Sequence, residues 1–91
     1  MPALSLLFGA YINLDWCDEY GSPWDALTDF CNIEPAMVAP MLQEISELLA
    51  APHDESALQS LLTDALGCGY VPYPDGFTYR TWLLELMRRT R

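Results

Sequence analysis

The sequence predicts an all-α fold, a compact bundle of about five short amphipathic helices with two aromatic-rich loops. Apolar residues recur at spacings i, i+3, i+4, i+7 and i+8, which places them on one stripe of a helix. Capping residues stand where several stripes begin, and proline or glycine stands where some of them end. The chain has 91 residues, the size of one domain with a modest core. We therefore expect a single domain over residues 1–91.

The first two predicted helices lie in the N-terminal third of the chain. Pro2 suits the opening turn of the first helix, whose stripe contains five residues: Leu4, Leu7, Phe8, Tyr11 and Ile12. The second helix begins at Ser22, which can cap it, with Pro23 at the first helical position and Asp25 completing a short capping box. Its predicted inner face consists of Trp24, Leu27, Phe30 and Cys31.

The third predicted helix starts at Pro35 and ends before Pro52, and Pro40 is expected to delay or kink its first turns. Its stripe contains six residues: Val38, Met41, Leu42, Ile45, Leu48 and Leu49.

Two more helices complete the prediction. The fourth is capped near Asp54 and stopped by Gly67 in a left-handed conformation, and its stripe is Leu58, Leu61, Leu62, Ala65 and Leu66. The fifth is capped near Thr78, and its stripe is Tyr79, Trp82, Leu83, Leu86 and Met87.

Two segments do not match a helix. Residues 13–21 lack a full apolar stripe, and residues 67–76 are interrupted by three glycines and two prolines. The prolines also argue against a central strand in the second segment. Both segments are therefore predicted to be aromatic-rich loops.

The charge of the chain is strongly one-sided. Its 13 carboxylates are opposed by four arginines and no lysine, and all four arginines lie at or after Arg80. Nucleic acids and anionic membranes bind through Lys and Arg, so this charge excludes them as expected partners and favours a basic protein. The alternative is that a net charge of −9 only keeps the protein soluble.

The location of the protein is predicted from its start and its apolar runs. The N-terminus lacks the basic and long apolar regions of a secretory signal, and no apolar run approaches the roughly 20 residues that span a bilayer. We therefore expect a cytoplasmic protein. Cys17, Cys31 and Cys68 have no C-x-x-C spacing, so we expect reduced, mostly buried thiols, without a disulfide framework or a zinc site.

Catalytic chemistry has no clear candidate in the sequence. The single histidine, His53, has no nucleophile motif near it and is interpreted as a surface loop residue. Asp15, Asp18 and Glu19 cluster, but they lack the spacing of a calcium loop, and carboxylates are abundant throughout the chain. We expect no catalytic residue, cofactor, metal or small-molecule substrate; a small hydrolase that uses this cluster is the least favoured alternative.

A candidate binding surface lies between residues 15 and 29. Carboxylates alternate there with aromatic residues, a mixture that suits a cationic protein partner. The candidate contacts are Asp15, Asp18, Glu19, Asp25 and Asp29. The interleaved Trp16, Tyr20 and Trp24 are either contacts or core, and we favour core for the tryptophans.

Arg80 stands in the first turn of the last predicted helix, where the helix dipole opposes a cation. We therefore expect another group to hold it. The hypothesis from the sequence is a structural ion pair between Arg80 and Asp15 or Glu19, which would tie the first loop to the last helix.

Several residues together resemble a known family. These are Phe8-Gly9-Ala10-Tyr11, Asp15-Trp16, Glu19-Tyr20, Leu66-Gly67-Cys68, Tyr70, Pro72, Tyr79-Arg80 and Trp82-Leu83. In this order they resemble the CdiI immunity proteins of bacterial contact-dependent growth inhibition systems, over nearly the whole chain. The motif positions Tyr11, Trp16, Gly67 and Trp82, together with Arg80, are expected to serve the scaffold.

The resemblance implies a role in competition between bacteria. An immunity protein of this family would bind the C-terminal toxin domain of its cognate CdiA-type effector in the cytoplasm and block it. Such toxins are frequently nucleases with basic substrate grooves, which agrees with the acidic charge of this chain. An acidic helical adaptor or regulatory protein that binds a basic protein remains the alternative.

Overall fold

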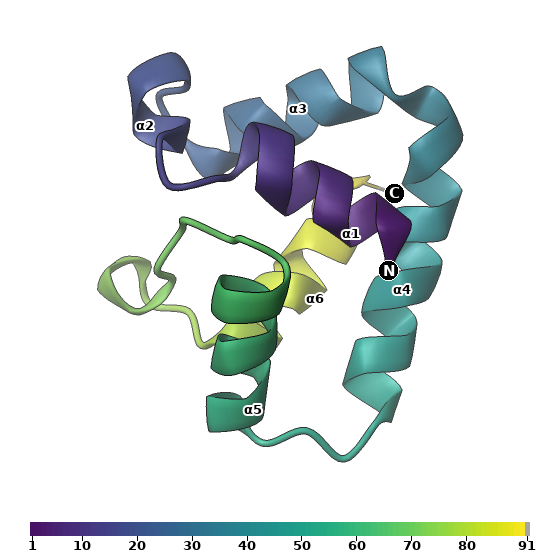
Figure 1. The fold of residues 1–91 in the computed structure, drawn as a ribbon, viewed down its shortest axis with the longest axis vertical. Coiled ribbons are helices and arrows are strands. Elements are labelled where there is room, and N and C mark those ends of the chain that lie inside the picture. The colour runs from purple at the N-terminus through teal and green to yellow at the C-terminus, as the bar shows by residue number, and fades with distance from the viewer. Residues whose placement is uncertain (91) are drawn as a thin grey trace.

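Helices form in all five regions where the apolar periodicity predicts them. The computed structural model describes residues 1–90, and these residues contain no strand. Figure 1 shows the helices α1 to α6. Their bounds are Pro2–Leu6 for α1, Trp16–Glu19 for α2, Pro23–Ile33 for α3, Val38–Ala50 for α4, Glu55–Ser60 for α5 and Tyr79–Thr90 for α6. The predicted all-α class is confirmed.

The predicted capping residues begin three of the helices. The Ser22 hydroxyl accepts a hydrogen bond from the Asp25 N–H at 3.2 Å, and Asp54 accepts one from the Ala57 N–H at 2.7 Å. Before α6, the Thr78 and Thr81 hydroxyls each accept the backbone N–H of the other residue, at 3.1 and 2.8 Å. These bonds satisfy N–H groups that have no partner within the first turn of a helix.

Other local features differ from the prediction. Residues 16–19 form the one-turn helix α2 inside a segment predicted to be a loop. A 3-10 turn, Pro35–Met37, precedes α4 and places Pro40 in the first turn of α4, where its missing N–H costs no hydrogen bond. The helices α1 and α5 each continue as a π-helical turn, Leu7–Tyr11 and Leu61–Ala65.

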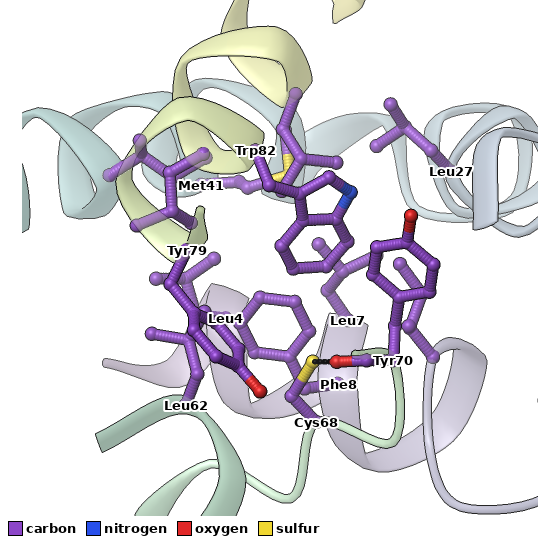
Figure 2. Packing of buried hydrophobic residues seen from close by; sticks show 14 of the residues in the cluster. Leu4, Leu7, Phe8, Leu27, Met41, Leu62, Cys68, Tyr70, Tyr79 and Trp82 are labelled. Atoms are coloured by element: carbon purple, nitrogen blue, oxygen red, sulfur yellow. Dashed lines mark hydrogen bonds between the residues drawn. The ribbon is translucent and has the colours of Figure 1, made fainter. Parts of the chain in front are cut away.

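The core forms where α1, α4 and α6 meet the loop after α5. Trp82 of α6 is completely buried, and its ring lies 5.8 Å from the Phe8 ring and 4.8 Å from the Tyr70 ring, between centroids. Figure 2 shows these rings among aliphatic side chains from several helices. The labelled residues are Leu4, Leu7, Phe8, Leu27, Met41, Leu62, Cys68, Tyr70, Tyr79 and Trp82.

The loop after α5 is fixed against the segment that follows α1. Gly67 ends the helical stretch with a φ of +80°, as predicted for a left-handed stop. Two residues later, the Gly69 N–H donates to the Ile12 carbonyl oxygen at 2.8 Å. A β-carbon on Gly69 would lie only 2.0 Å from the backbone oxygen of Asn13, so the two backbones touch. Only glycine permits this approach.

Two carboxylates cap helices that are distant in the sequence. Glu44 of α4 is 7% exposed, and it accepts hydrogen bonds from the Ala3 and Leu4 N–H groups at 3.1 and 2.9 Å. Glu55 of α5 accepts the N–H of Tyr79 at the start of α6. A carboxylate at a helix N-terminus is stabilised by the dipole and by the free N–H groups. These caps join α4 to α1 and α5 to α6.

The lengths and composition of the helices determine whether any of them could cross a membrane. Within residues 1–90, none of the helices has both the length and the apolar content required to traverse a bilayer.

Candidate protein-interaction site

The predicted acidic contacts lie on α2 and α3, at one end of the bundle. We call this the acidic face: Asp15, Asp18, Glu19, Asp25 and Asp29. Figure 1 shows α2 projecting from the bundle next to the start of α3. The first four of these side chains are exposed, and Asp29 is half-buried. The structure therefore places four of the five candidates where a partner can reach them.

A tyrosine connects the two halves of the acidic face. The Tyr20 hydroxyl, just after α2, donates to the Asp29 carboxylate on α3 at 2.8 Å. This hydrogen bond, burial and the charges of Asp29 and Glu19 raise the pKa of Tyr20 to about 12. Asp29 therefore positions α2 against α3, and it is less available to a partner than the other four carboxylates.

The negative charge at this end of the molecule also affects the pKa of the neighbouring Tyr11. Burial is the largest cause that raises the pKa of its hydroxyl, and the charges of Glu34 and Asp29 raise it further. Its ring packs edge-on against Phe30 at 5.4 Å between centroids. Tyr11 thus packs against the core beside the acidic face.

The carboxylates of the acidic face have no cationic partner within residues 1–90. The ion pairs in this part of the chain join Glu85 to Arg88 and Arg89, inside α6. Hydrogen bonds from Arg88 and then Arg89 lower the pKa of Glu85 to about 2. Within residues 1–90, the carboxylates of α2 and α3 are therefore not neutralised by an ion pair.

The aromatic residues between these carboxylates lie at the edge of the core. Trp16, Tyr20 and Trp24 are half-buried and pack against the buried cluster, so the assignment of the tryptophans to the core is only partly right. The Trp16 ring contacts Tyr70 edge-on at 5.8 Å between centroids. The guanidinium of Arg89 lies 3.9 Å from the centre of the Trp24 ring, which suits a cation–π contact.

The predicted ion pair between Arg80 and Asp15 or Glu19 is wrong. The Arg80 guanidinium instead donates to the backbone oxygens of Leu49 at 3.3 Å and His53 at 3.0 Å. Leu49 lies in the last turn of α4, where the carbonyl groups lack helical partners and the dipole favours a cation. Arg80 therefore joins α6 to the end of α4.

Replacing Arg80 with Met is expected to lower the free energy of unfolding by about 1–2 kcal/mol, because two half-buried carbonyl groups lose a charged donor. Urea denaturation measures this change. The control is Asp15→Asn with Glu19→Gln, which should leave stability unchanged, since these carboxylates do not contact Arg80. Equal destabilisation by the control would restore the ion-pair hypothesis.

Other predicted features can also be placed. Of the three thiols, Cys68 is buried, Cys31 is half-buried and Cys17 is exposed, so the prediction of mostly buried cysteines fails for Cys17. His53 is half-buried between α4 and α5. Among residues 1–90, no three His, Cys, Asp or Glu side chains converge as metal ligands.

The sequence interpretation missed several residues. The sequence pattern does not identify Glu44 and Glu55 as caps, although Glu44 interrupts an apolar stripe and therefore needs a hydrogen-bond partner. Leu14 was also unassigned, and its side chain is 81% exposed beside the acidic face. Because Leu14 lies outside every predicted apolar stripe, the sequence already indicates that it is exposed.

Comparison with known proteins settles the family. A family model described as "CdiI immunity protein" matches residues 1–90. The chain belongs to the CdiI immunity protein family. The motifs from Phe8 to Leu83, which suggested this family, therefore lie in a genuine member, and immunity proteins act as inhibitors.

A solved structure that is similar to this CdiI family member supports the same family. It is a chain of the "Crystal structure of CdiA-CT/CdiI complex from Y. kristensenii 33638", with a TM-score of 0.89 and 28% sequence identity. The similarity covers 99% of this chain and 97% of that chain. A search among curated proteins found no match.

Proposed function

We propose that this protein is an immunity protein that binds and neutralises the C-terminal toxin domain of a cognate CdiA-type effector in the cytoplasm. The observation that carries the proposal is the similarity, over 99% of the chain, to a chain of a CdiA-CT/CdiI complex. The protein acts by binding rather than by catalysis, as a single domain over residues 1–91.

We further propose that it covers a basic active site, with the acidic face as part of the contact. The exposed carboxylates Asp15, Asp18, Glu19 and Asp25 would lie opposite arginine or lysine side chains of the toxin. A nuclease fits this arrangement best, because its groove must attract a polyanion. A contact of ordinary size would bury about 800 Å² of this protein.

The direct test begins by finding the CdiA-type effector gene that should precede the gene of this protein, and then co-expresses the C-terminal domain of that effector with it. The toxin domain alone should arrest growth, and the full-length immunity protein should restore it and co-purify with the domain. Toxin domains of unrelated effectors serve as the control and should not be neutralised. Failure to bind or protect against the neighbouring toxin would contradict the proposed function.

The role of the acidic face has a matched test. Asp15→Asn combined with Asp18→Asn removes two exposed charges, and we expect association with the toxin to slow about tenfold at low salt. Stopped-flow association rates measure this effect, and added salt should reduce the difference.

The control for this test is Glu47→Gln combined with Asp64→Asn, which removes the same charge from α4 and the turn after α5. It should slow association less than twofold. Equal effects of the two double variants would mean that only the net charge matters, and that the acidic face is not the contact.

A further inference from the structure

We infer that the toxin contact is centred where residues 12–16 cross residues 69–73, with Leu14 and Val71 as its apolar anchors. We call this region the crossing. Its occupant is the toxin domain of the cognate effector, which would present an apolar patch surrounded by arginine or lysine. The inference rests on the proposed function and names the part of the surface that supplies the binding energy.

Exposed apolar side chains concentrate at the crossing. Six large apolar residues within residues 1–90 are exposed: Met1, Leu14, Ile33, Val71, Tyr73 and Leu84. Three of them come from the two short segments of the crossing, with exposed fractions of 81% for Leu14, 55% for Val71 and 45% for Tyr73. The Tyr73 ring packs on Tyr79 and its hydroxyl donates to Glu55, so Leu14 and Val71 are the apolar side chains left for a partner. A leucine this exposed adds almost nothing to the core, and exposed apolar side chains that gather in one region are typical of an interaction surface.

The two segments meet through their backbones. The Gly69 N–H donates to the Ile12 oxygen at 2.8 Å, and the position of a β-carbon on Gly69 would be 2.5 Å from the Leu14 nitrogen. Beside this contact, the Trp16 and Tyr70 rings pack at 5.8 Å between centroids. Leu14 and Val71 therefore project from one region although 56 positions separate them in the sequence. Figure 1 shows the two connections approaching each other beside α2.

The crossing is held in place before any partner arrives. The Asn13 side chain donates to the Gly9 oxygen at 3.3 Å and accepts the Asp15 N–H at 2.9 Å. On the other segment, the Tyr70 hydroxyl donates to the Asp75 carboxylate, and Tyr70 itself is buried. A surface that is ordered in the free protein loses little conformational entropy on binding.

The charge around the crossing determines what kind of partner fits it. Asp15 and Asp18 follow Leu14, and Asp75 follows Val71, whereas neither segment contains a lysine or arginine. The nearest cation in the sequence, Arg80, donates to the carbonyl oxygens of Leu49 at the end of α4 and of His53 in the connection between α4 and α5. An apolar centre with carboxylates beside it complements an apolar patch with basic residues beside it, where the centre supplies affinity and the charges supply fast association.

The experiment measures the dissociation constant of the complex between the full chain and the cognate toxin domain, together with protection of growth. The test variants are Leu14→Ser and Val71→Thr. We expect Leu14→Ser to weaken binding at least about tenfold, mainly through faster dissociation, and Val71→Thr to weaken it about threefold to tenfold. Thermal melting of each variant should match the original protein, because both side chains are exposed.

Matched controls are Ile33→Ser on α3 and Leu84→Ser on α6, whose side chains are 59% and 50% exposed. Each should change the dissociation constant less than twofold. Equal weakening by the controls, or less than twofold weakening by both test variants, would overturn the crossing as the centre of the contact while the proposed function stands. Failure of the original protein to bind the toxin domain would overturn both.

Discussion

Replacing Gly69 with alanine is expected to lower the free energy of unfolding by about 2–3 kcal/mol. The added methyl group would lie 2.0 Å from the Asn13 oxygen and 2.3 Å from its carbonyl carbon, and neither backbone atom can rotate away. The φ angle of Gly69 is not positive, so the cost comes from the contact and not from the backbone conformation. Urea denaturation monitored by tryptophan fluorescence measures it.

The control for this prediction is Gly9→Ala. A β-carbon at Gly9 meets nothing within 4 Å, and this residue lies in the π-helical turn after α1, where alanine restricts the unfolded chain more than glycine does. We expect Gly9→Ala to be neutral or to stabilise by up to about 1 kcal/mol. Similar effects of the two substitutions would show that the backbones at the crossing can separate without cost.

Gly69→Ala also links the fold to binding. Because the crossing depends on the close approach of Gly69 to Asn13, a methyl group there should move residues 12–16 away from residues 69–73. Toxin binding by the remaining folded protein should then weaken together with stability. Leu14→Ser, by contrast, should weaken binding without a loss of stability. The two variants therefore distinguish the effect of moving the backbone from the effect of removing one apolar side chain.

Local signals explain why so much of the fold could be predicted. Ser22, Asp54 and Thr78 cap helices within three residues of their own positions, and Gly67 stops a helix through its own φ. Apolar spacing likewise depends on one helix at a time. These features need no knowledge of the distant chain, and the caps and the glycine stop are confirmed. The stripe of the fourth predicted helix is wrong at Ala65, which is exposed because the π-helical turn Leu61–Ala65 changes the helical period.

The candidate site was predictable only in part for the same reason. The exposure of Asp15 and Asp18 follows from their charge in a segment without a full apolar stripe, but the hydrogen bond from Tyr20 to Asp29 depends on how α2 packs against α3. The sequence also indicated that Arg80 needs a partner, yet it could not show that the partners are backbone oxygens 27 and 31 residues away. The crossing itself depends on a backbone contact that leaves no pattern in the side chains beyond a glycine.

The position of Glu44 indicates a hydrogen-bond partner that is distant in the sequence, because no cation is available to pair with it. It interrupts the stripe formed by Met41, Ile45 and Leu48, and no lysine or arginine precedes Arg80 to pair with it. A buried carboxylate without a cation must accept hydrogen bonds from N–H groups, and the free N–H groups of a folded helical protein are concentrated at helix starts. The start of α1 provides them.

Replacing Glu44 with alanine is therefore expected to lower the free energy of unfolding by about 2–4 kcal/mol, because the buried N–H groups of Ala3 and Leu4 lose their acceptor. The melting temperature of a chain this size should fall by roughly 10–20 °C. Glu44→Gln should cost less, since an amide oxygen still accepts one hydrogen bond while its NH₂ group cannot accept the other.

The matched control is Glu47→Ala, one turn further along α4. Its side chain is exposed and accepts only a hydrogen bond from Gln43 at 3.3 Å, so the change should be below about 0.5 kcal/mol. Hydrogen exchange provides a local measurement, because loss of the cap should increase exchange at the start of α1 before it affects α6. Equal stability of Glu44→Ala and Glu47→Ala would show that α1 is held by its apolar stripe alone and that the carboxylate is not its cap.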